Sequence, residues 1–334
     1  MISEGEQLQN SSTQLHGINP ESVIQLLKSR AGCAAPPASD GRKLALLVEG
    51  GGMRGVCSAG GLVALDALGF RNSFDAIYGV SAGAMDVAYM LSGQGVFGIQ
   101  IYYKNINNRK FINFRRLRKV VDIDFLFDEI VTQVRPLDIE KVLESPSDFF
   151  IGLIDNDSAE NVVLRTKDFP TEALSLLKAT TALPVVYNKS VQIGSRRYID
   201  GGLGSPVPLL HAIQAGCTDL VVFLTRPSSS ESQPPKLWER QLFSRFTARG
   251  NAKLQALFER GSGETNVCRR ICLGKTPPPQ PVNIATFCPA ETDTVLSRLT
   301  TDGRRLKQSA VEMALSTLRQ FGGAPDLIHD LVES

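Results

Sequence analysis

The sequence is poor in the features that mark membrane-spanning, disulfide-rich and metal-binding chains. Its 334 residues include only three histidines, and no apolar run approaches the roughly 18 residues that a membrane span needs. The six cysteines are scattered, and Cys268 and Cys272 stand four positions apart with no nearby histidine to complete a zinc site. A chain of this length does not need disulfides, so we expect reduced thiols and neither a metal nor a cofactor.

The charge balance also excludes some partners. The net charge is +2 and the isoelectric point about 8.2, which gives no case for nucleic acid or strongly acidic partners. The first seven residues lack the basic start and apolar core of a signal peptide, from which we expect a cytoplasmic protein. With 43% hydrophobic residues the chain can fill the core of one large α/β domain.

Two short apolar runs are each followed by a glycine turn and a helix-compatible segment. Leu44–Val48 leads into Gly50-Gly51-Gly52-Met53-Arg54-Gly55, and Phe74–Tyr78 leads into Gly79-Val80-Ser81-Ala82-Gly83. Such alternation is typical of parallel strands with crossover helices, and it predicts a three-layer α/β/α sandwich with a mostly parallel central sheet. Ligands of these sheets bind at the carboxyl ends of the strands, where both turns fall.

The second turn fits the G-x-S-x-G pattern of a nucleophile elbow. In that motif Ser81 is held clear of the backbone, and Gly79 and Gly83 let neighbouring chain approach closely. The start of the following helix favours negative charge, as an alkoxide or a tetrahedral oxyanion would carry. Five residues alone also fit an ordinary strand-to-helix turn, so the prediction depends on the strand before the serine and the helix after it.

The first turn has the spacing G-x-G-x-x-G, which is also found in dinucleotide-binding proteins. Those proteins place an acidic residue at the end of the second strand, whereas Asp75 stands at its beginning. A phosphate-binding loop is excluded because no Lys-Ser or Lys-Thr follows the glycines. The remaining interpretation is a run of backbone N–H groups near Ser81 that stabilises an oxyanion.

A third turn follows the predicted strand that ends at Asp200. Gly201 and Gly202 force a turn there, which predicts that this carboxylate lies at the same edge of the sheet as Ser81. The three motifs in this order resemble the patatin-like phospholipase family over a region that ends at Pro227, and the segments 202–208 and 225–227 resemble its bacterial members. The resemblance runs from about Leu44 and includes the segment 179–184.

This resemblance implies a serine acyl hydrolase with a Ser-Asp dyad that acts on phospholipids or related lipids. Ser81 would attack the acyl ester, Asp200 would take its proton, and the turn from Gly50 to Gly55 would form the oxyanion hole. An exposed aspartate is a poor base, so Asp200 needs a dry pocket that raises its pKa. The glycines at 79, 83, 201 and 202 would support the two turns, and Arg54 would hold the glycine turn, add positive potential, or simply lie at the surface.

The resemblance also suggests how the chain is divided. We expect a polar and partly disordered arm over residues 1–40, a catalytic domain over 41–227, and a helical extension over 228–334 that completes the same domain. Two positions depart from the family pattern, since Ser205 and Asp86 stand where asparagine is frequent. Neither is the nucleophile or the base, so they bear on substrate fit.

Alternatives remain open for the mechanism and for the function. Ser81, Asp200 and then His211 or His329 would match the order of an α/β-hydrolase triad, but His211 falls in a predicted helix and His329 in a polar tail. The fold could also serve a non-catalytic lipid- or nucleotide-binding protein. Among enzymes, a transacylase or thioesterase would use the same acyl-enzyme.

Two further segments have competing interpretations. The stretch 109–119 holds six cations with interleaved aromatics and no acid, which favours either peripheral contact with an anionic membrane surface or a solvated face paired with Asp122, Asp124 and Asp128. The segment 236–260 has apolar residues at helical spacing, typical of a lid, a membrane-facing helix or a core helix. By contrast, Asp155–Ser158 is predicted to be a turn between strands, because Glu160 stands where a calcium-binding loop needs glycine.

Overall fold

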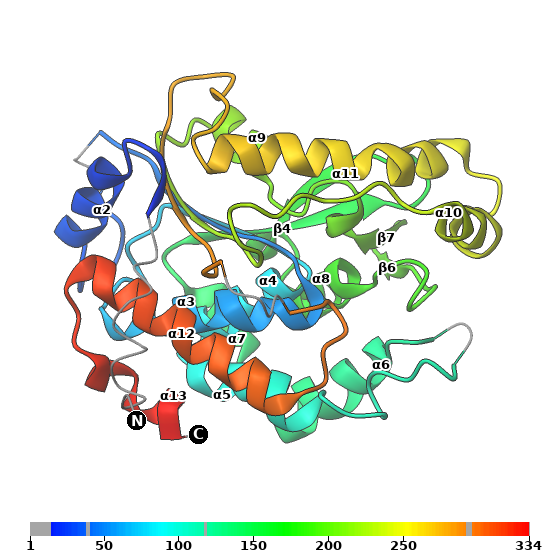
Figure 1. Ribbon diagram of the computed structural model, residues 1–334, viewed down its shortest axis with the longest axis horizontal. Helices are drawn as coiled ribbons and strands as arrows, with labels where there is room; N and C mark the ends of the chain where they lie inside the picture. The colour runs from blue at the N-terminus through cyan, green and yellow to red at the C-terminus, as the bar shows by residue number, and fades with distance from the viewer. Residues whose placement is uncertain (1–14, 38–40, 117–118, 292–295, 334) are drawn as a thin grey trace.

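A nine-stranded sheet runs through the middle of the molecule (Figure 1), in a computed structural model that describes residues 15–37, 41–116, 119–291 and 296–333. The strand order is β1-β9-β8-β2-β3-β4-β7-β6, with β5 paired to β4. The strands are β1 (His16–Ile18), β2 (Leu44–Val48), β3 (Ala76–Val80), β4 (Asp148–Asp155), β5 (Asn161–Arg165), β6 (Val191–Ile193), β7 (Arg196–Asp200), β8 (Asp219–Phe223) and β9 (Asn283–Phe287).

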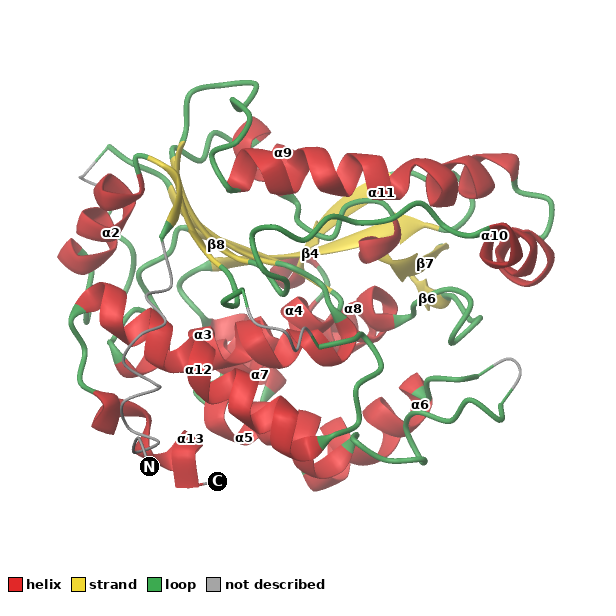
Figure 2. Cartoon of the chain, in the orientation of Figure 1, coloured by secondary structure: helices red, strands yellow, loops and turns green. Residues whose placement is uncertain are grey.

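Helices cover both faces of this sheet (Figure 2). Side chains of β2 alternate between two cores: Leu46 packs with α3, α4 and α12, whereas Leu47 packs with α9 and α11. The predicted three-layer α/β/α sandwich is therefore confirmed. The helices are α2 (Pro20–Ser29), α3 (Gly55–Ala67), α4 (Ala82–Leu91), α5 (Gly95–Gln100), α6 (Ile123–Phe125), α7 (Ile139–Glu144), α8 (Ala173–Thr181), α9 (Leu209–Gln214), α10 (Leu237–Phe243), α11 (Ala252–Cys272), α12 (Gly303–Phe321) and α13 (His329–Glu333).

The centre of the sheet is parallel and its margins are antiparallel. Strands β9, β8, β2, β3 and β4 run in one direction, while β1, β5, β7 and β6 pair antiparallel with their neighbours. The strand that carries Asp200 is thus not one of the parallel strands that the sequence analysis assumed. It overlaps only the last three residues of β4, so that Asp200 pairs with Leu153 and still lies near the carboxyl ends of β3 and β4.

Two expected elements have different boundaries. β3 begins two residues later than predicted and extends through Val80, so the sharp turn begins at Ser81 itself. The expected helix over 236–260 is broken into α10, the π-helical segment η7 (Ser244–Ala248) and α11, with Arg249 and Gly250 at positive φ between them. No helix in the described ranges is both long and apolar enough to cross a bilayer.

The expected N-terminal arm is in part an element of the domain. Residues 1–14 lie outside the described residues, but β1 pairs with β9, and α2 buries four apolar side chains that include Val23 and Leu27. Arg30, which is fully buried, forms an ion pair with Asp75 at 2.7 Å. Residues 16–30 are therefore packed rather than part of a disordered arm, because apolar burial and a paired buried charge fix them to the sheet.

Candidate active site

Ser81 lies at the junction of β3 and α4 in a backbone conformation that side chains rarely adopt, with φ 53° and ψ −128°. A Cβ on Gly79 would lie 2.6 Å from the Cα of Ala84. A Cβ on Gly83 would lie 2.6 Å from the Val48 carbonyl oxygen. The turn is as tight as a nucleophile elbow requires, and both flanking positions must be glycine.

Asp200 is brought to this turn by β7 and is 1% exposed. The Ser81 hydroxyl donates to Asp200 Oδ2 at 2.8 Å, and the Gly202 amide donates to Oδ1 at 2.7 Å. Burial raises the pKa of Asp200 to about 6, against the opposing effects of these two hydrogen bonds and of Arg298. Gly201 is required here as well, since a Cβ there would lie 2.4 Å from the Gly152 carbonyl oxygen. The serine and the aspartate are 119 residues apart in sequence and in hydrogen-bond contact in space.

The glycine turn offers fewer open donors than its sequence suggests. The amides of Gly50, Met53 and Arg54 already donate to the carbonyls of Pro206, Arg298 and Gly51, and the Gly55 amide donates within the turn. Among the residues that the structure describes, the Gly51 and Gly52 amides have no acceptor. Only these two of the six predicted residues offer an N–H group to a ligand.

Two residues beside Ser81 were missed by the sequence analysis. The Ala82 amide begins α4 and follows the serine, which is the usual place of an oxyanion donor in an elbow. The Ser81 amide itself donates to Thr180 Oγ1 at 2.8 Å, and this hydroxyl donates to the Gly152 carbonyl at 2.7 Å. The elbow pattern could have indicated Ala82, whereas Thr180 lies in the segment 179–184 of the family resemblance but no motif there indicates its hydrogen bond to Ser81.

An apolar cavity begins at Ser81, Asp200 and the glycine turn. Its wall comes from α4, from the segment that follows α5, and from residues 183–186. Phe111 and Ile112 of the basic stretch are buried in this wall rather than exposed. The apolar lining includes Met53, Ala82, Met85, Tyr89, Ile101, Tyr102, Ile106, Phe111, Ile112, Val121, Ile123, Leu126, Leu183, Val186, Pro206 and Leu299.

Asp86 is a carboxylic acid in this apolar wall and is 6% exposed. Tyr102 donates to its Oδ1 at 2.7 Å and Ser58 to its Oδ2 at 3.0 Å. Burial outweighs both hydrogen bonds and raises the pKa of Asp86 to about 8. The side chain is therefore neutral at pH 7. Asparagine, which is frequent at this position in the family, is neutral at every pH.

We expect Asp86→Asn to stabilise the protein at alkaline pH. Between the ordinary pKa of 3.8 and the folded value of about 8, the folded chain holds a proton that the unfolded chain has lost, so the free energy of unfolding falls as pH rises through this range. Asparagine removes this effect, so the free energy of unfolding should rise by on the order of 3 to 5 kcal/mol at pH 8 and change little near pH 4. Urea unfolding at both pH values measures this difference. An equal change in the free energy of unfolding at the two pH values would contradict the raised pKa of Asp86.

Arg54 is not a surface residue, because only 9% of it is exposed. Its Nε has no hydrogen-bond acceptor among the described residues, and burial together with the charge of Arg298 lowers its pKa to about 9. The nearby Glu49 is fully buried and accepts from Arg269 Nη1 at 3.1 Å at both oxygens. Arg54 therefore adds positive charge behind the glycine turn.

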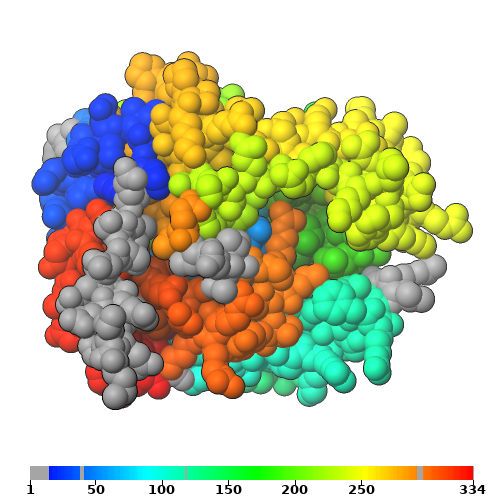
Figure 3. All heavy atoms as spheres, viewed as in Figure 1, coloured from blue at the N-terminus to red at the C-terminus, as the bar shows by residue number. Residues whose placement is uncertain are grey.

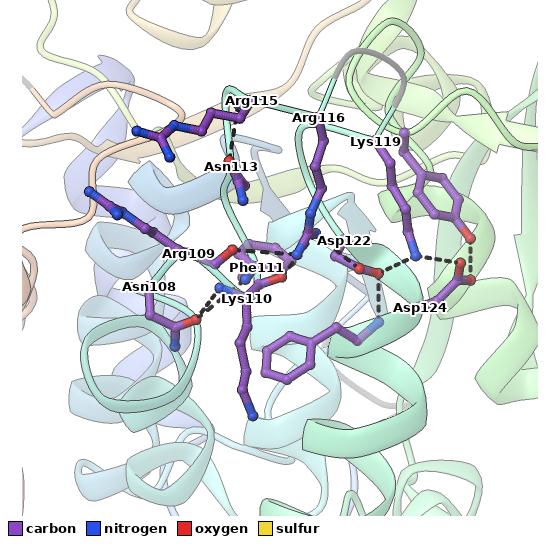
Figure 4. Close-up of polar contacts among 12 residues, drawn as sticks. Asn108, Arg109, Lys110, Phe111, Asn113, Arg115, Arg116, Lys119, Asp122 and Asp124 are labelled. Carbon is purple, nitrogen blue, oxygen red and sulfur yellow. Dashed lines mark hydrogen bonds and ion pairs between the residues drawn. The ribbon is translucent and has the colours of Figure 1, made fainter.

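Two of the five described cations in the basic stretch form ion pairs, as Figure 4 shows. Arg116 forms an ion pair with Asp122 at 3.1 Å, and Lys119 with Asp122 at 2.6 Å and Asp124 at 3.1 Å. The guanidinium groups of Arg109 and Arg115 point away from this network (Figure 4). Arg118 lies outside the described residues. The interpretation as a face paired with acidic residues therefore holds for Arg116 and Lys119.

Exposed apolar side chains accompany the unpaired cations. Phe114 is 70% exposed beside Arg115, and on α10 Leu237 and Trp238 are 76% and 55% exposed. Figure 3 shows α10 and the loop before α6 projecting above and below a recess at one end of the face in view. Phe243, by contrast, is buried and stacks on Phe258 with ring centroids 4.2 Å apart, so α10 has one packed face and one exposed face.

The histidines are all remote from the cavity. His16 is in β1, His211 is a half-buried residue of α9, and His329 is exposed in α13. None of the three is among the described residues that line the cavity, and none contacts Asp200 by a hydrogen bond in the described part of the chain.

The described residues also contain no group of three or more potential metal ligands. At the predicted turn, Asp155 Oδ1 accepts the amides of Asp157 and Ser158 at 3.0 Å each.

The chain is similar to known proteins over this region. Residues 46–213 match the family model described as patatin-like phospholipase. A curated relative, the uncharacterized protein YjjU of Escherichia coli, is 30% identical over 230 residues. The match covers 66% of this chain and 61% of the relative, so the chain spans about three fifths of that relative's length.

A solved structure also aligns with the chain. VipD from Legionella pneumophila is 10% identical, with a TM-score of 0.41, over 84% of this chain and 67% of that one.

Proposed function

Because the chain belongs to the patatin-like phospholipase family, we propose that it is a serine acyl hydrolase that cleaves fatty acyl esters of phospholipids or related lipids. The observation that carries the proposal is the 2.8 Å hydrogen bond from Ser81 to a buried Asp200 at the mouth of an apolar cavity. An acyl chain fits the apolar wall, and the ester carbonyl then lies beside the hydroxyl. A nucleophile, a base and an acyl site are thereby combined.

In the proposed mechanism, Asp200 accepts the Ser81 proton as the serine oxygen attacks the ester carbonyl. The oxyanion that forms accepts hydrogen bonds from the Gly51, Gly52 and Ala82 amides, and Arg54 contributes positive potential behind them. Collapse of this intermediate breaks the ester bond, and Asp200 returns the proton to the departing alcohol. Water then attacks the acyl-enzyme with Asp200 again as base, which releases the fatty acid and restores Ser81.

The proposal is tested by mass spectrometry of a mixed phospholipid extract after incubation with the purified protein. We expect free fatty acids and lysolipids to accumulate with the natural chain and not with Ser81→Ala. If acyl groups moved to other alcohols or thiols, the enzyme would be a transacylase or thioesterase with the same acyl-enzyme. If the two extracts were identical, the non-catalytic lipid-binding or nucleotide-binding alternative would replace the proposal.

We also propose that the loop around Phe114 contacts anionic membrane surfaces. Arg109, Lys110 and Arg115 are exposed in the same loop as the exposed Phe114 ring, a combination that suits the interface between headgroups and acyl chains. The exposed face of α10 with Trp238 would contact the same surface. Such contact would deliver lipid to the cavity without a membrane-spanning segment.

We expect the triple change of Arg109, Lys110 and Arg115 to glutamine to weaken binding to anionic vesicles. Each cation near such a surface contributes about 1 kcal/mol, so the loss is on the order of 100-fold at low salt and smaller at high salt. Vesicle cosedimentation at two salt concentrations measures it. A matched triple change at Lys28, Lys141 and Lys275, which are exposed on other elements, should have no such effect. Equal binding by both variants would favour a solvated loop.

A further inference from the structure

Arg298 lies on the opposite side of the glycine turn from Ser81. At one end of the turn, a Cβ on Gly50 would lie 3.1 Å from the Ser81 Cβ. At the other end, the Met53 amide donates to the Arg298 carbonyl oxygen at 3.1 Å. Arg298 also lines the cavity mouth together with Ser81 and Asp200. The open amides of the turn therefore lie between the serine and this arginine.

The side chain of Arg298 is available to a ligand. It is exposed, and within the described ranges its guanidinium makes no hydrogen bond or ion pair. Its charge reaches the site, since it lowers the pKa of Asp200 against the larger effect of burial and lowers that of Arg54. A guanidinium at this place presents several N–H donors, in a geometry that matches phosphate or carboxylate oxygens.

The surroundings of Arg298 have an excess of positive charge. Of the four charges that act most strongly on Arg54, only Glu49 is negative, and the others belong to Arg298, Arg226 and Arg269. Glu49 is already bound by Arg269 and by the amide and hydroxyl of Thr225. Glu49 is thus shared by Arg269 and by Arg226, which lies 3.7 Å from it, and in the described part of the chain neither Arg54 nor Arg298 forms an ion pair.

We infer that Arg298 binds the phosphate group of the substrate and so makes the site selective for acyl esters with a phosphate close to the scissile bond. This inference rests on the proposed function. In a glycerophospholipid the phosphate is a few covalent bonds from the ester carbonyl. When the acyl chain occupies the apolar cavity and the carbonyl oxygen lies at the Gly51 and Gly52 amides, the phosphate extends toward the far side of the turn, where Arg298 lies.

The test compares kcat/KM for a monoacylglycerol and for its glycerol phosphate counterpart with the same acyl chain. Arg298→Gln removes a charge-assisted hydrogen bond at a partly exposed site. We therefore expect the kcat/KM for the phosphate ester, divided by that for the neutral ester, to fall about tenfold. Arg298→Lys, which keeps the charge without the planar fork, should recover part of the ratio. Arg304→Gln is the matched control, because Arg304 is exposed six residues away and does not line the cavity.

The inference would be overturned if Arg298→Gln left kcat/KM unchanged for both esters. It would also be overturned if kcat/KM fell equally for both, which would indicate a role in the shape of the glycine turn. Inorganic phosphate separates the two sources of the anion. If it inhibited at concentrations at or below the KM of the phosphate ester, the ligand would be free phosphate rather than a lipid headgroup. Failure of the proposed function is distinct, because the natural chain would then turn over neither ester, or Ser81→Ala would turn over both as fast as the natural chain.

Discussion

Ser81→Ala should abolish ester turnover while the chain stays folded. Removal of the nucleophile from a serine hydrolase lowers kcat roughly 10⁴- to 10⁶-fold, because no other group at the site can form the acyl-enzyme. Alanine keeps the Cβ that the tight turn accommodates, so the packing of β3 and α4 should not change. Initial rates on a soluble short-chain ester measure the loss, and thermal unfolding checks the fold.

Ser92→Ala is the matched control for this experiment. Ser92 is a buried serine at the C-terminus of the same helix, and its hydroxyl donates to the Tyr89 carbonyl at 3.1 Å. Its replacement should leave turnover within about twofold, since it touches neither Asp200 nor the glycine turn. Comparable losses of turnover in Ser81→Ala and Ser92→Ala would show that any substitution of a serine at either end of α4 disturbs the site. Undiminished turnover in Ser81→Ala would refute the nucleophile.

Asp200→Asn should lower turnover about 10³- to 10⁴-fold, since the amide keeps the size of the side chain but takes no proton from Ser81. The amide oxygen can still accept from Gly202, so the turn should persist. Stability should not fall at pH 7. The natural carboxyl has a pKa of about 6 against an ordinary 3.8, so its ionisation costs stability as pH rises from 4 to 6, and asparagine avoids this cost.

The same pKa predicts the pH dependence of the natural enzyme. The base acts only when it has lost its proton, so kcat/KM should rise about tenfold per pH unit below pH 6 and level off above it. An enzyme with a His211 or His329 triad would instead lose activity when that histidine is replaced by alanine. A flat profile between pH 4 and 8, or full turnover in Asp200→Asn, would contradict the role of Asp200.

Local sequence patterns predict much of the central sheet. The run Leu44–Val48 is β2 to the residue, and the helical extension expected over 228–334 contains α12 at Gly303–Phe321. These segments have the clearest apolar periodicity and the clearest glycine or aspartate boundaries. The polar composition of residues 1–40 predicts a partly disordered arm. The apolar face of α2 and the buried Arg30 hold this segment in place by contacts with residues far along the chain, and local sequence does not show such contacts.

The juxtaposition of Ser81 and Asp200 was expected for a reason that is only partly correct. Parallel strands would bring the two residues together where the strands end, whereas β7 is antiparallel to β4 and reaches the site because its overlap with that strand is short. Register of this kind depends on tertiary pairing. Arg298 was missed for a similar reason: it follows β9 by several residues in a segment without a motif, and only packing against the glycine turn brings it to the cavity.

The central claim is that Ser81 is an activated nucleophile, and labelling with a fluorophosphonate probe tests it most directly. The probe reacts covalently with serines whose hydroxyl is made nucleophilic by a base, and peptide mass spectrometry then locates the adduct. We expect one adduct, on the peptide that contains Ser81, with labelling lost in Ser81→Ala and strongly slowed in Asp200→Asn. An unlabelled natural chain, or an adduct on a different serine, would contradict the account.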